Sequence, residues 1–572
     1  MSSEVAVELD VPAEMRDGAV LRANVYRPGG EGRWPVLLTR LPYGKDFPLG
    51  SVVLDPVQTA RQGYVVVVQD TRGRFTSGGE WYPMVHEAED GYDTVQWAAS
   101  LPYADGQVGT YGVSYFGFTQ WAAASQHPPA LRAMVPNVTW NDPFNGLVYR
   151  GGAIELGTQG SWHLNMGLDV LARRYRHDPP ALRAAVRDLY REYDALGTEG
   201  YASLPLRDFA PHRRQDVGSA FLDVLQRPLD SDDPLVRATS VGSWQDVVDV
   251  PTLNVGGWYD CFLGDTIANF CAMRQRGRPT QLLIGPWSHT GQTNPVGERN
   301  FGFGAQAAFI DLEIDVQSLQ RRWFDHWLRG IDTGLLDRPP IRLFTMGTNE
   351  WRYEETWPPA GVEAVPHYLH AGGGLSRRTP GDEAPDRYDY DPGDPVPTHG
   401  GATLLTPEFR PGPWDQARVE GRPDVLVYTS EPLDRDVEMT GPVEAHLWAV
   451  TSAPDTDWVV RLCEVFPDGR SLNLTDGIVR ARYREGARGV APALIEPGHA
   501  YHYVIDLWAT SNVFRAGHRI RVQVTSSCFP RWDRNPNTGQ GIGETADVQV
   551  AHQQVLHDRD HPSHLLLPIR PR

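Results

Sequence analysis

The chain has 572 residues, of which 41% are hydrophobic and 22% are charged, a composition typical of soluble globular proteins. A chain of this length is too long for one hydrophobic core, so we expect two or three domains. Its 72 acidic and 53 basic residues give a formal net charge of -19 at pH 7, which argues against nucleic-acid binding.

Other bulk features indicate where the protein resides. No apolar run approaches the roughly 18 residues of a membrane span, and the first residues lack a charged-then-apolar signal segment. The four cysteines are scattered without metal-ligand spacing, which favours free thiols in a reducing compartment. We therefore expect a cytoplasmic protein that is not bound to a membrane.

The first 144 residues have the pattern of an α/β sheet. Residues 4–27 alternate apolar and polar around Arg16-Asp17-Gly18, which predicts a hairpin. Continuous apolar runs then predict parallel strands buried on both faces, at residues 36–38, 64–68, 108–111 and 133–135. A helical pattern over residues 89–100 separates the second and third runs, and this βαβ order predicts a layered α/β domain.

The character of the sequence changes twice after that point. From 145 to 244 helical segments such as 180–193 replace the strand pattern, which predicts a helical cap or an ordinary helical subdomain. Strand patterns return at 252–256 and 281–285, and a helix over 317–328 is expected to complete the α/β domain by residue 345.

Residues 346–572 have the pattern of an all-β domain. Short alternating segments predict a β-sandwich, of which a jelly roll is one form; they include residues 424–429, 443–450 and 518–524. Residues 371–400 are rich in Gly, Asp and Pro, and we expect them to form a long surface loop.

One turn of the α/β domain carries a candidate nucleophile. Ser114 lies between the predicted strand 108–111 and a helix predicted over 118–125, with Gly112 before it and Gly117 after it. A nucleophile elbow needs small neighbours because its sharp turn crowds the backbone, and its usual pattern is G-x-S-x-G. The second glycine here falls one position late, so a glycine turn with an incidental serine is the alternative interpretation.

Two later strand ends carry the partners that such a serine requires. A serine hydroxyl needs an imidazole to accept its proton, and the imidazole needs a carboxylate to orient it. Asp260 follows the strand at 252–256, and His289 follows the strand at 281–285. Asp260 could instead cap a helix, and His289 is one of 18 histidines. The order Ser, Asp, His nevertheless favours a catalytic triad of the α/β-hydrolase type.

Two groups are candidates for the oxyanion hole. The backbone N–H of Tyr115 follows the elbow serine and can donate one hydrogen bond to an oxyanion. The loop at residues 40–45 follows an early strand and lacks an HGGG-type run, so we expect a side-chain donor, the hydroxyl of Tyr43. The alternative is that Tyr43 only packs beside Pro42.

Several short motifs together resemble the cocaine esterase-like hydrolases, a group that includes the Xaa-Pro dipeptidyl-peptidases and the α-amino acid ester hydrolases. The motifs of the α/β part are Gly112-x-Ser114-Tyr115-x-Gly117, Arg40-x-Pro42-Tyr43, Gln69-Asp-x-Arg-Gly73, Gly257-Trp-Tyr-Asp260 and Gly285-Pro-Trp-Ser-His289. Those of the last third are Phe466-Pro-Asp-Gly-Arg470, Thr510-Ser-Asn-Val-Phe514, Gly517-His-Arg-Ile520 and Asn535-x-Asn-Thr-Gly539. In that group the late glycine of the elbow is the norm, and the cap is the part least clearly matched.

The resemblance implies an α/β-hydrolase domain formed by residues 1–144 and 245–345, a helical cap at 145–244 and a C-terminal jelly roll at 346–572. It implies that Ser114 is the nucleophile, His289 the general base and acid, and Asp260 its orienting partner. The Tyr43 hydroxyl and the Tyr115 amide would form the oxyanion hole. It implies neither a metal nor an organic cofactor.

The resemblance also bears on the substrate. The amino-ester hydrolases carry acidic residues two and three positions after the triad acid, where this chain has Phe262 and Leu263. A neutral or hydrophobic acyl group is therefore expected. Phe262 and Trp162 match pocket aromatics of the cocaine esterases, but Leu147 and Thr406 replace two others, which weakens the case for benzoate esters. The acyl pocket expected from this match comprises Phe262, Trp162, Leu147, Leu405 and Thr406.

Three functional hypotheses follow. The first is a serine esterase that forms an acyl-enzyme with a small-molecule ester, acting as a monomer or homodimer. The second is an Xaa-Pro dipeptidyl-peptidase, an amide acylase or an α-amino acid ester hydrolase, which needs a buried carboxylate at the acyl pocket; Glu155 is the candidate. The third is a non-catalytic binding protein that uses the jelly roll, against which the intact Ser, Asp and His argue.

Overall fold

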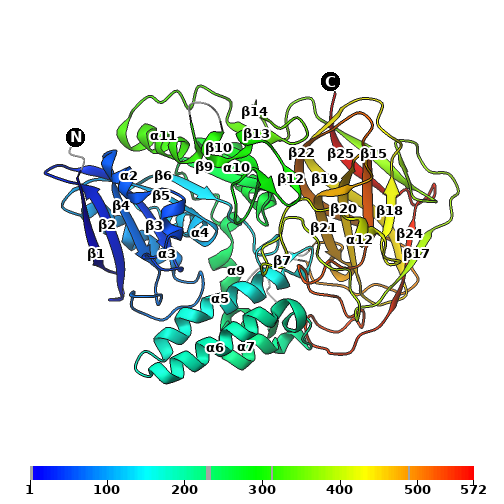
Figure 1. The fold of residues 1–572 in the computed structure, drawn as a ribbon, viewed down its shortest axis with the longest axis horizontal. Coiled ribbons are helices and arrows are strands. Elements are labelled where there is room, and N and C mark those ends of the chain that lie inside the picture. The colour runs from blue at the N-terminus through cyan, green and yellow to red at the C-terminus, as the bar shows by residue number, and fades with distance from the viewer. Residues whose placement is uncertain (1–3, 227–232, 311–313, 487–489, 572) are drawn as a thin grey trace.

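The computed structural model describes residues 4–226, 233–310, 314–486 and 490–571. Figure 1 shows a sheet flanked by helices at the left and top, a group of helices below, and a β-rich part at the right. The helices below are cyan to green-cyan, and the part with the sheet is blue and green, so the helical group is inserted within the chain of the sheet domain (Figure 1).

The first part is built on one ten-stranded sheet. Its strands are β1 Val5–Glu14, β2 Val20–Pro28, β3 Trp34–Leu41, β4 Val65–Asp70, β5 Ala104–Val113, β6 Leu131–Asn137, β9 Thr252–Tyr259, β10 Thr280–Ser288, β13 Ile341–Thr345 and β14 Glu350–Glu354. Their order in space is β1-β2-β4-β3-β5-β6-β9-β10-β13-β14. From β4 to β13 neighbouring strands are parallel, whereas β1, β2 and β14 pair antiparallel.

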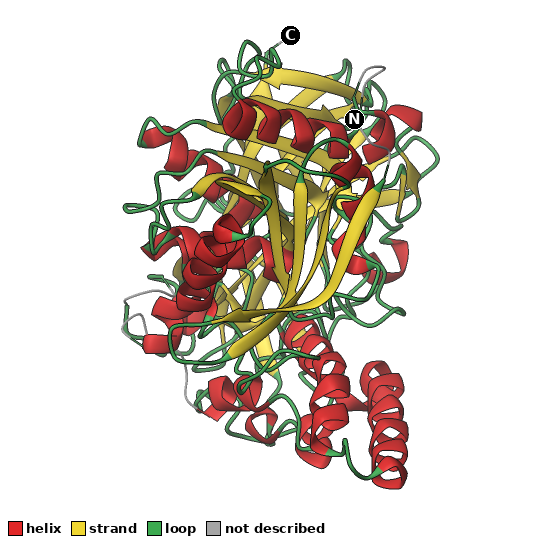
Figure 2. Cartoon of the chain, turned by 90° about the vertical axis from the view of Figure 1, so that its left-hand side faces the viewer, coloured by secondary structure: helices red, strands yellow, loops and turns green. Residues whose placement is uncertain are grey.

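Helices cover both faces of this sheet because alternate strand residues point to opposite sides. The helices are α1 Leu49–Val52, α2 Pro56–Arg61, α3 Glu87–Ser100, α4 Ser114–Ala124, α10 Leu263–Gln275 and α11 Val316–Arg329. Val36 and Leu38 of β3 share a core with α3 and α4, whereas Leu37 shares one with α11. Figure 2 shows helices on either side of the strands. The predicted α/β class is confirmed.

The inserted part is helical, as the sequence predicts. It begins with a small hairpin, β7 Tyr149–Arg150 and β8 Ala153–Ile154, and continues through α5 Leu156–Arg174, α6 Pro179–Ala195, α7 Ala210–Gln215, α8 Ser219–Gln226 and α9 Pro234–Thr239. The predicted segment 180–193 lies in α6, which has one buried residue, Leu189. The long helix α5 is more deeply buried, and its Trp162 reaches Tyr43 of the sheet domain.

The C-terminal part is a β-sandwich-like domain with one connected set of strands. These are β15 Glu363–His370, β16 Gly374–Ser376, β17 Asp386–Tyr390, β18 Leu426–Thr429, β19 Val437–Thr451, β20 Asp457–Val465, β21 Ser471–Arg480, β22 Tyr501–Phe514, β23 Arg519–Thr525, β24 Ala551–Leu556 and β25 His564–Arg570. They follow the order β17-β24-β19-β25-β15-β16-β18-β23-β20-β21, with β22 paired to β19. The remaining short elements are the ladder of β11 Pro295–Val296 with β12 Arg299–Asn300, and α12 Ala417–Glu420.

Three local expectations need correction. Residues 371–400 are not one loop, because they contain β16 and β17; Tyr388 and Tyr390 point inward with the two-residue period of a strand. The helix after the elbow begins at Ser114, four residues before the predicted start. The first sheet extends to Glu354, because β14 pairs with β13. We therefore propose that the domain boundary follows Glu354 rather than residue 345.

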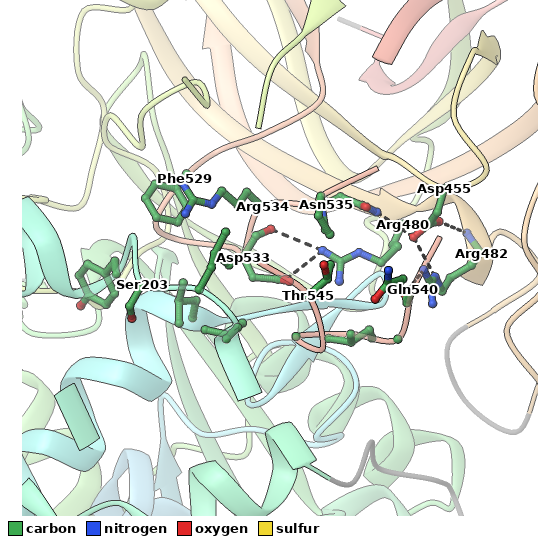
Figure 3. Close-up of a pocket in the computed structure, with 18 residues that line it drawn as sticks. Ser203, Asp455, Arg480, Arg482, Phe529, Asp533, Arg534, Asn535, Gln540 and Thr545 are labelled. Carbon is green, nitrogen blue, oxygen red and sulfur yellow. Dashed lines mark hydrogen bonds and ion pairs between the residues drawn. The ribbon is translucent and has the colours of Figure 1, made fainter. Parts of the chain in front are cut away.

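A buried cluster of ion pairs in the C-terminal domain binds the cap through a backbone hydrogen bond. Arg480 Nε and Nη2 donate to the Asp457 carboxylate at 2.8 and 2.9 Å, and Nη2 also donates to Asp533 Oδ1 at 2.9 Å. Asp533 in turn accepts from the backbone N–H of Ile154 in the cap hairpin at 2.7 Å. Figure 3 shows Arg480 and Asp533 in the lining of a pocket between the two parts. Arg480 and Arg482 are paired with acidic neighbours, and Arg534 donates to the carbonyls of Pro392 and Ala202. These internal contacts indicate a structural junction rather than a ligand site.

The first prediction concerns this junction. Arg480→Met leaves Asp457 and Asp533 buried without their cation, so the free energy of unfolding should fall by about 3–5 kcal/mol. Arg470→Met is the matched control, because its pair with Asp468 has side chains 49% and 55% exposed. Solvent screens such a pair, so this variant should leave the free energy of unfolding nearly unchanged. Urea denaturation measures both, and equal losses would contradict the importance of the buried pair.

Candidate active site

Ser114 occupies a strained turn between β5 and α4. Its φ is +54°, in the left-handed region that non-glycine residues rarely adopt. A Cβ atom at Gly112 would lie 2.4 Å from Phe116 Cδ2, and one at Gly117 would lie 2.8 Å from Thr139 Cβ. The second glycine stands at 117 because there the first turn of α4 packs on the segment after β6. The late glycine is thus a consequence of packing.

The structure brings the three predicted triad residues together at the carboxyl ends of β5, β9 and β10. Nε2 of His289 lies 3.0 Å from Oγ of Ser114, and Nδ1 lies 2.6 Å from Oδ1 of Asp260. Because the ionised carboxylate only accepts, Nδ1–H donates to Asp260, and Nε2 is left to accept from the serine hydroxyl. Asp260 is fully buried, and the side chain of His289 is 8% exposed. This geometry permits proton transfer from Ser114 to His289.

Tyr43 is placed to donate a hydrogen bond beside Ser114. Its hydroxyl oxygen accepts from the indole N–H of Trp162 in α5 at 3.0 Å, so the hydroxyl proton is left for another acceptor. Burial raises the pKa of Tyr43 to about 12, which keeps this proton in place at neutral pH. Tyr43 therefore does more than pack beside Pro42.

Tyr115 contributes through its backbone. Its N–H belongs to the first turn of α4, where amide groups have no carbonyl partner within the helix. Its side chain is engaged elsewhere: the hydroxyl donates to Glu87 Oε1 at 2.9 Å and accepts from the N–H of Met84 at 2.8 Å. The side-chain contacts anchor the turn, and the amide remains available to an oxyanion.

Buried polar contacts hold the Tyr43 loop, and they explain the motif around residues 69–73. Arg74 Nε donates to the carbonyl of Pro42 at 2.9 Å, and the N–H of Lys45 donates to Asp70 Oδ1 at 2.6 Å. Arg40 pairs with Glu87 at 2.9 Å and donates to Gln69 Oε1 at 3.0 Å. The sequence motifs included Arg40, Pro42, Gln69 and Asp70 without assigning them a role, whereas Arg74 and Glu87 lay outside every motif. We propose that these contacts position the loop.

A small cavity opens beside Ser114, Tyr43 and Tyr115. Its further lining residues are Met84, Trp140, Leu147, Thr158, Gln159, Trp162, Phe262 and Leu404. These residues carry no formal charge. Three of the five predicted pocket residues, Phe262, Trp162 and Leu147, line it.

The other two predicted pocket residues do not line this cavity. Leu404 reaches it, whereas Leu405 lies against Gly157 and Thr406 is buried near Tyr201. In an irregular segment, side chains do not alternate regularly, so a match of sequence positions misplaced the contact by one residue. Glu155 also lies elsewhere: its Oε1 accepts from the indole N–H of Trp532 at 2.8 Å.

A second, open cleft meets the cavity at Ser114, Tyr43, Trp162 and Leu404. His289 lines this cleft but not the small cavity. The cleft extends along residues 287–293 and 306–308 toward the start of α11. Ser114 therefore stands between two compartments, and His289 faces the larger one.

Among the described residues, one group of His, Cys and acidic side chains is close enough to hold a metal ion, namely Asp260, Cys261 and His289. The two ligand atoms of His289 and Asp260 are 2.6 Å apart. Tetrahedral zinc with bonds of about 2.0–2.1 Å would separate them by roughly 3.3 Å. The observed spacing fits a hydrogen-bonded pair and is too short for this ion. In the described part of the chain, no helix has the length and apolarity of a membrane span.

Comparison with known proteins agrees with this geometry. Residues 17–291 match the model of the X-Pro dipeptidyl-peptidase (S15 family), and residues 333–566 match that of the X-Pro dipeptidyl-peptidase C-terminal non-catalytic domain. A cocaine esterase from Rhodococcus sp. (strain MB1 Bresler) is 38% identical, with 99% of this chain and 98% of that protein covered.

Two solved structures share the whole fold. An α-amino acid ester hydrolase superposes with a TM-score of 0.81 at 25% identity, covering 100% of this chain and 97% of the other. An aminopeptidase from a marine sediment Thaumarchaeota archaeon has a TM-score of 0.80 at 24% identity, covering 99% and 96%; that likeness concerns the fold alone. Fold and relatives define the class: a serine ester hydrolase. The chain belongs to the S15 X-Pro dipeptidyl-peptidase family.

The second prediction concerns Trp162. Trp162→Phe removes the N–H that donates to Tyr43 but keeps an aromatic ring at the cavity, so kcat for ester hydrolysis should fall about 5–10-fold with little change in KM. Trp244→Phe is the control, because Trp244 is a cap tryptophan packed on Phe118 that does not line the cavity. Equal kcat values for the two variants in steady-state assays would contradict the role of the indole N–H.

Proposed function

We propose that this protein hydrolyses esters of small, neutral carboxylic acids through an acyl-enzyme on Ser114. The observation that carries the proposal is the chain of hydrogen bonds Ser114–His289–Asp260, which ends at a small uncharged cavity. A small pocket with a largely aromatic and aliphatic lining suits a small apolar acyl group.

In the proposed mechanism, Ser114 Oγ attacks the ester carbonyl as His289 Nε2 accepts its proton. Asp260 stabilises the imidazolium through the hydrogen bond at Nδ1. The oxyanion of the tetrahedral intermediate accepts from the Tyr43 hydroxyl and the Tyr115 amide. His289 then protonates the leaving alcohol, and a water molecule repeats the sequence to release the acid.

The cleft and the cavity would each bind one half of the ester. His289 must reach the leaving oxygen, and it lines the cleft rather than the small cavity. We therefore place the alcohol in the open cleft and the acyl group in the cavity. The larger space on the alcohol side favours esters whose alcohol is bulkier than the acid.

A peptidase or amino-ester activity is the second candidate, favoured by the family model and the neighbouring structures. A free amino group on the acyl side needs a buried carboxylate partner. Phe262 lines the cavity where an acid would be required, and Glu155 is bonded to Trp532 instead. These contacts favour neutral acyl groups. A binding role for the C-terminal domain alone would not explain why His289 is hydrogen-bonded to Ser114.

The third prediction tests the proposal directly. Rapid mixing with p-nitrophenyl acetate, butyrate, benzoate and L-prolyl esters should give a stoichiometric burst of p-nitrophenol, with acetate and butyrate preferred over the prolyl ester. Ser114→Ala should fold normally and lose activity by several orders of magnitude. Activity retained in a folded Ser114→Ala protein would refute the nucleophile. Preference for the prolyl ester would instead support the second candidate.

The fourth prediction concerns the oxyanion hole. Tyr43→Phe removes one proposed donor and should lower kcat by about 10²–10³-fold, the usual loss for such a donor. Because burial raises the pKa of Tyr43 to about 12, the wild-type protein should lose no activity through ionisation of Tyr43 between pH 7 and pH 10. A change in KM alone for Tyr43→Phe would contradict this role.

A further inference from the structure

We infer that Trp508 of the C-terminal domain is a positioning residue for Asp260, so that this domain completes the catalytic site. The inference rests on the proposed function and extends it to a part of the chain outside the hydrolase domain. It starts from an irregularity in β22, the strand of the C-terminal domain that borders the green hydrolase segment in Figure 1. β22 contacts α10, β9 and β13 of the hydrolase domain.

The strand is distorted at Trp508. Along its ladder with β19, Leu507 and Trp508 together face Val443 alone, which is a β-bulge. Trp508 has a φ of +61°, which is unfavourable for a bulky aromatic residue. Its N–H donates to Asp506 Oδ1 at 2.7 Å. A bulge re-aims a side chain, and strain of this kind persists only where the surroundings enforce it.

The bulge directs the indole of Trp508 across the domain boundary onto the start of α10. A Cβ atom at Gly264 would lie 2.4 Å from Trp508 Cδ1, so the ring rests directly on the helix backbone. At another edge of the ring, a Cβ atom at Gly146 would lie close to Trp508 and to the carbonyl oxygen of Cys261. Two glycines thus make room for one tryptophan beside the segment 260–264.

Charge and hydrogen bonding hold the ring in this place. The guanidinium carbon of Arg150 lies 3.6 Å from its centroid, and the indole N–H donates to Asn145 Oδ1 at 3.3 Å. Arg150 is buried and donates to the carbonyl of Asp476 at 2.6 Å. Trp508 is itself 4% exposed. Cap, hydrolase domain and C-terminal domain therefore meet at this indole.

Asp260 depends on its backbone for its position. Its Oδ1 contacts His289, with the Cys261 thiol at 3.8 Å, and its buried Oδ2 has no hydrogen-bond partner among the described residues. Its carbonyl accepts from the N–H of Leu263 at 3.1 Å, which links it to the first turn of α10. Since few side-chain contacts fix the carboxylate, the packing of Trp508 on Gly264 determines where it lies.

The test compares two tryptophans of the same domain. Trp508→Leu should lower kcat for p-nitrophenyl butyrate about 10–50-fold and leave KM within about threefold, because a displaced acid misaligns His289 without changing the cavity. Trp458→Leu is the matched control, a fully buried tryptophan of β20 that packs on Tyr388 and Tyr503. It should lower Tm and keep kcat within about twofold.

Two further variants test the inference even if Trp508→Leu does not fold. Trp508→Phe restores a planar ring and should recover most of the lost kcat. Gly264→Ala places a methyl group where the indole lies, and it should lower kcat in the same way even if Trp508→Leu does not fold. Wild-type kcat in Gly264→Ala or in folded Trp508→Leu, or an equal loss in Trp458→Leu, would overturn the inference. Absence of a Ser114-dependent burst in the wild type would instead overturn the proposed function.

Discussion

The left-handed backbone at Ser114 is the constraint on which the site depends. Such a conformation costs about 1–3 kcal/mol for a non-glycine residue, and it persists because the chain on both sides is fixed. β5 lies in the middle of the sheet between β3 and β6, and α4 is packed along almost its whole length. Gly112 and Gly117 let Phe116 and Thr139 approach closely enough to enforce the turn. The serine is therefore exposed at a point that the core holds rigid.

The groups around Ser114 come from all three parts of the chain. The sheet supplies Asp260 and His289 from the ends of two adjacent parallel strands, whose separation the ladder sets. The cap supplies Trp162, whose N–H turns the Tyr43 hydroxyl toward the serine side. In our inference the C-terminal domain adds Trp508. A site assembled in this way excludes water on several sides, which strengthens each hydrogen bond within it.

The cavity lining separates this chain from relatives that act on amino compounds. An ammonium group buried beside Phe262, Leu147 and Leu404 would lack a counter-charge, and burying it unpaired would cost several kcal/mol, on the order of the penalties measured for isolated buried ions. The net charge of -19 does not change this, because exposed carboxylates are screened by salt over about 8–10 Å. Local chemistry, not overall charge, is therefore the basis of our proposal that the acyl group is neutral.

The sequence by itself determined the fold class, the elbow and the order of Ser114, Asp260 and His289, because these depend on local patterns: continuous apolar runs, small residues at a sharp turn, and polar residues at strand ends. The same reasoning did not predict β16 and β17, because their turn-rich surroundings hide the strand pattern, which in β17 depends on two inward-facing tyrosines. It also chose Leu405 instead of Leu404 as a pocket residue, in an irregular segment. Only the tertiary structure decided which side chains meet. The contacts of Trp162 with Tyr43, Arg480 with Asp533, and Trp508 with Gly264 join residues 53 to 244 positions apart, and no local pattern encodes such distances.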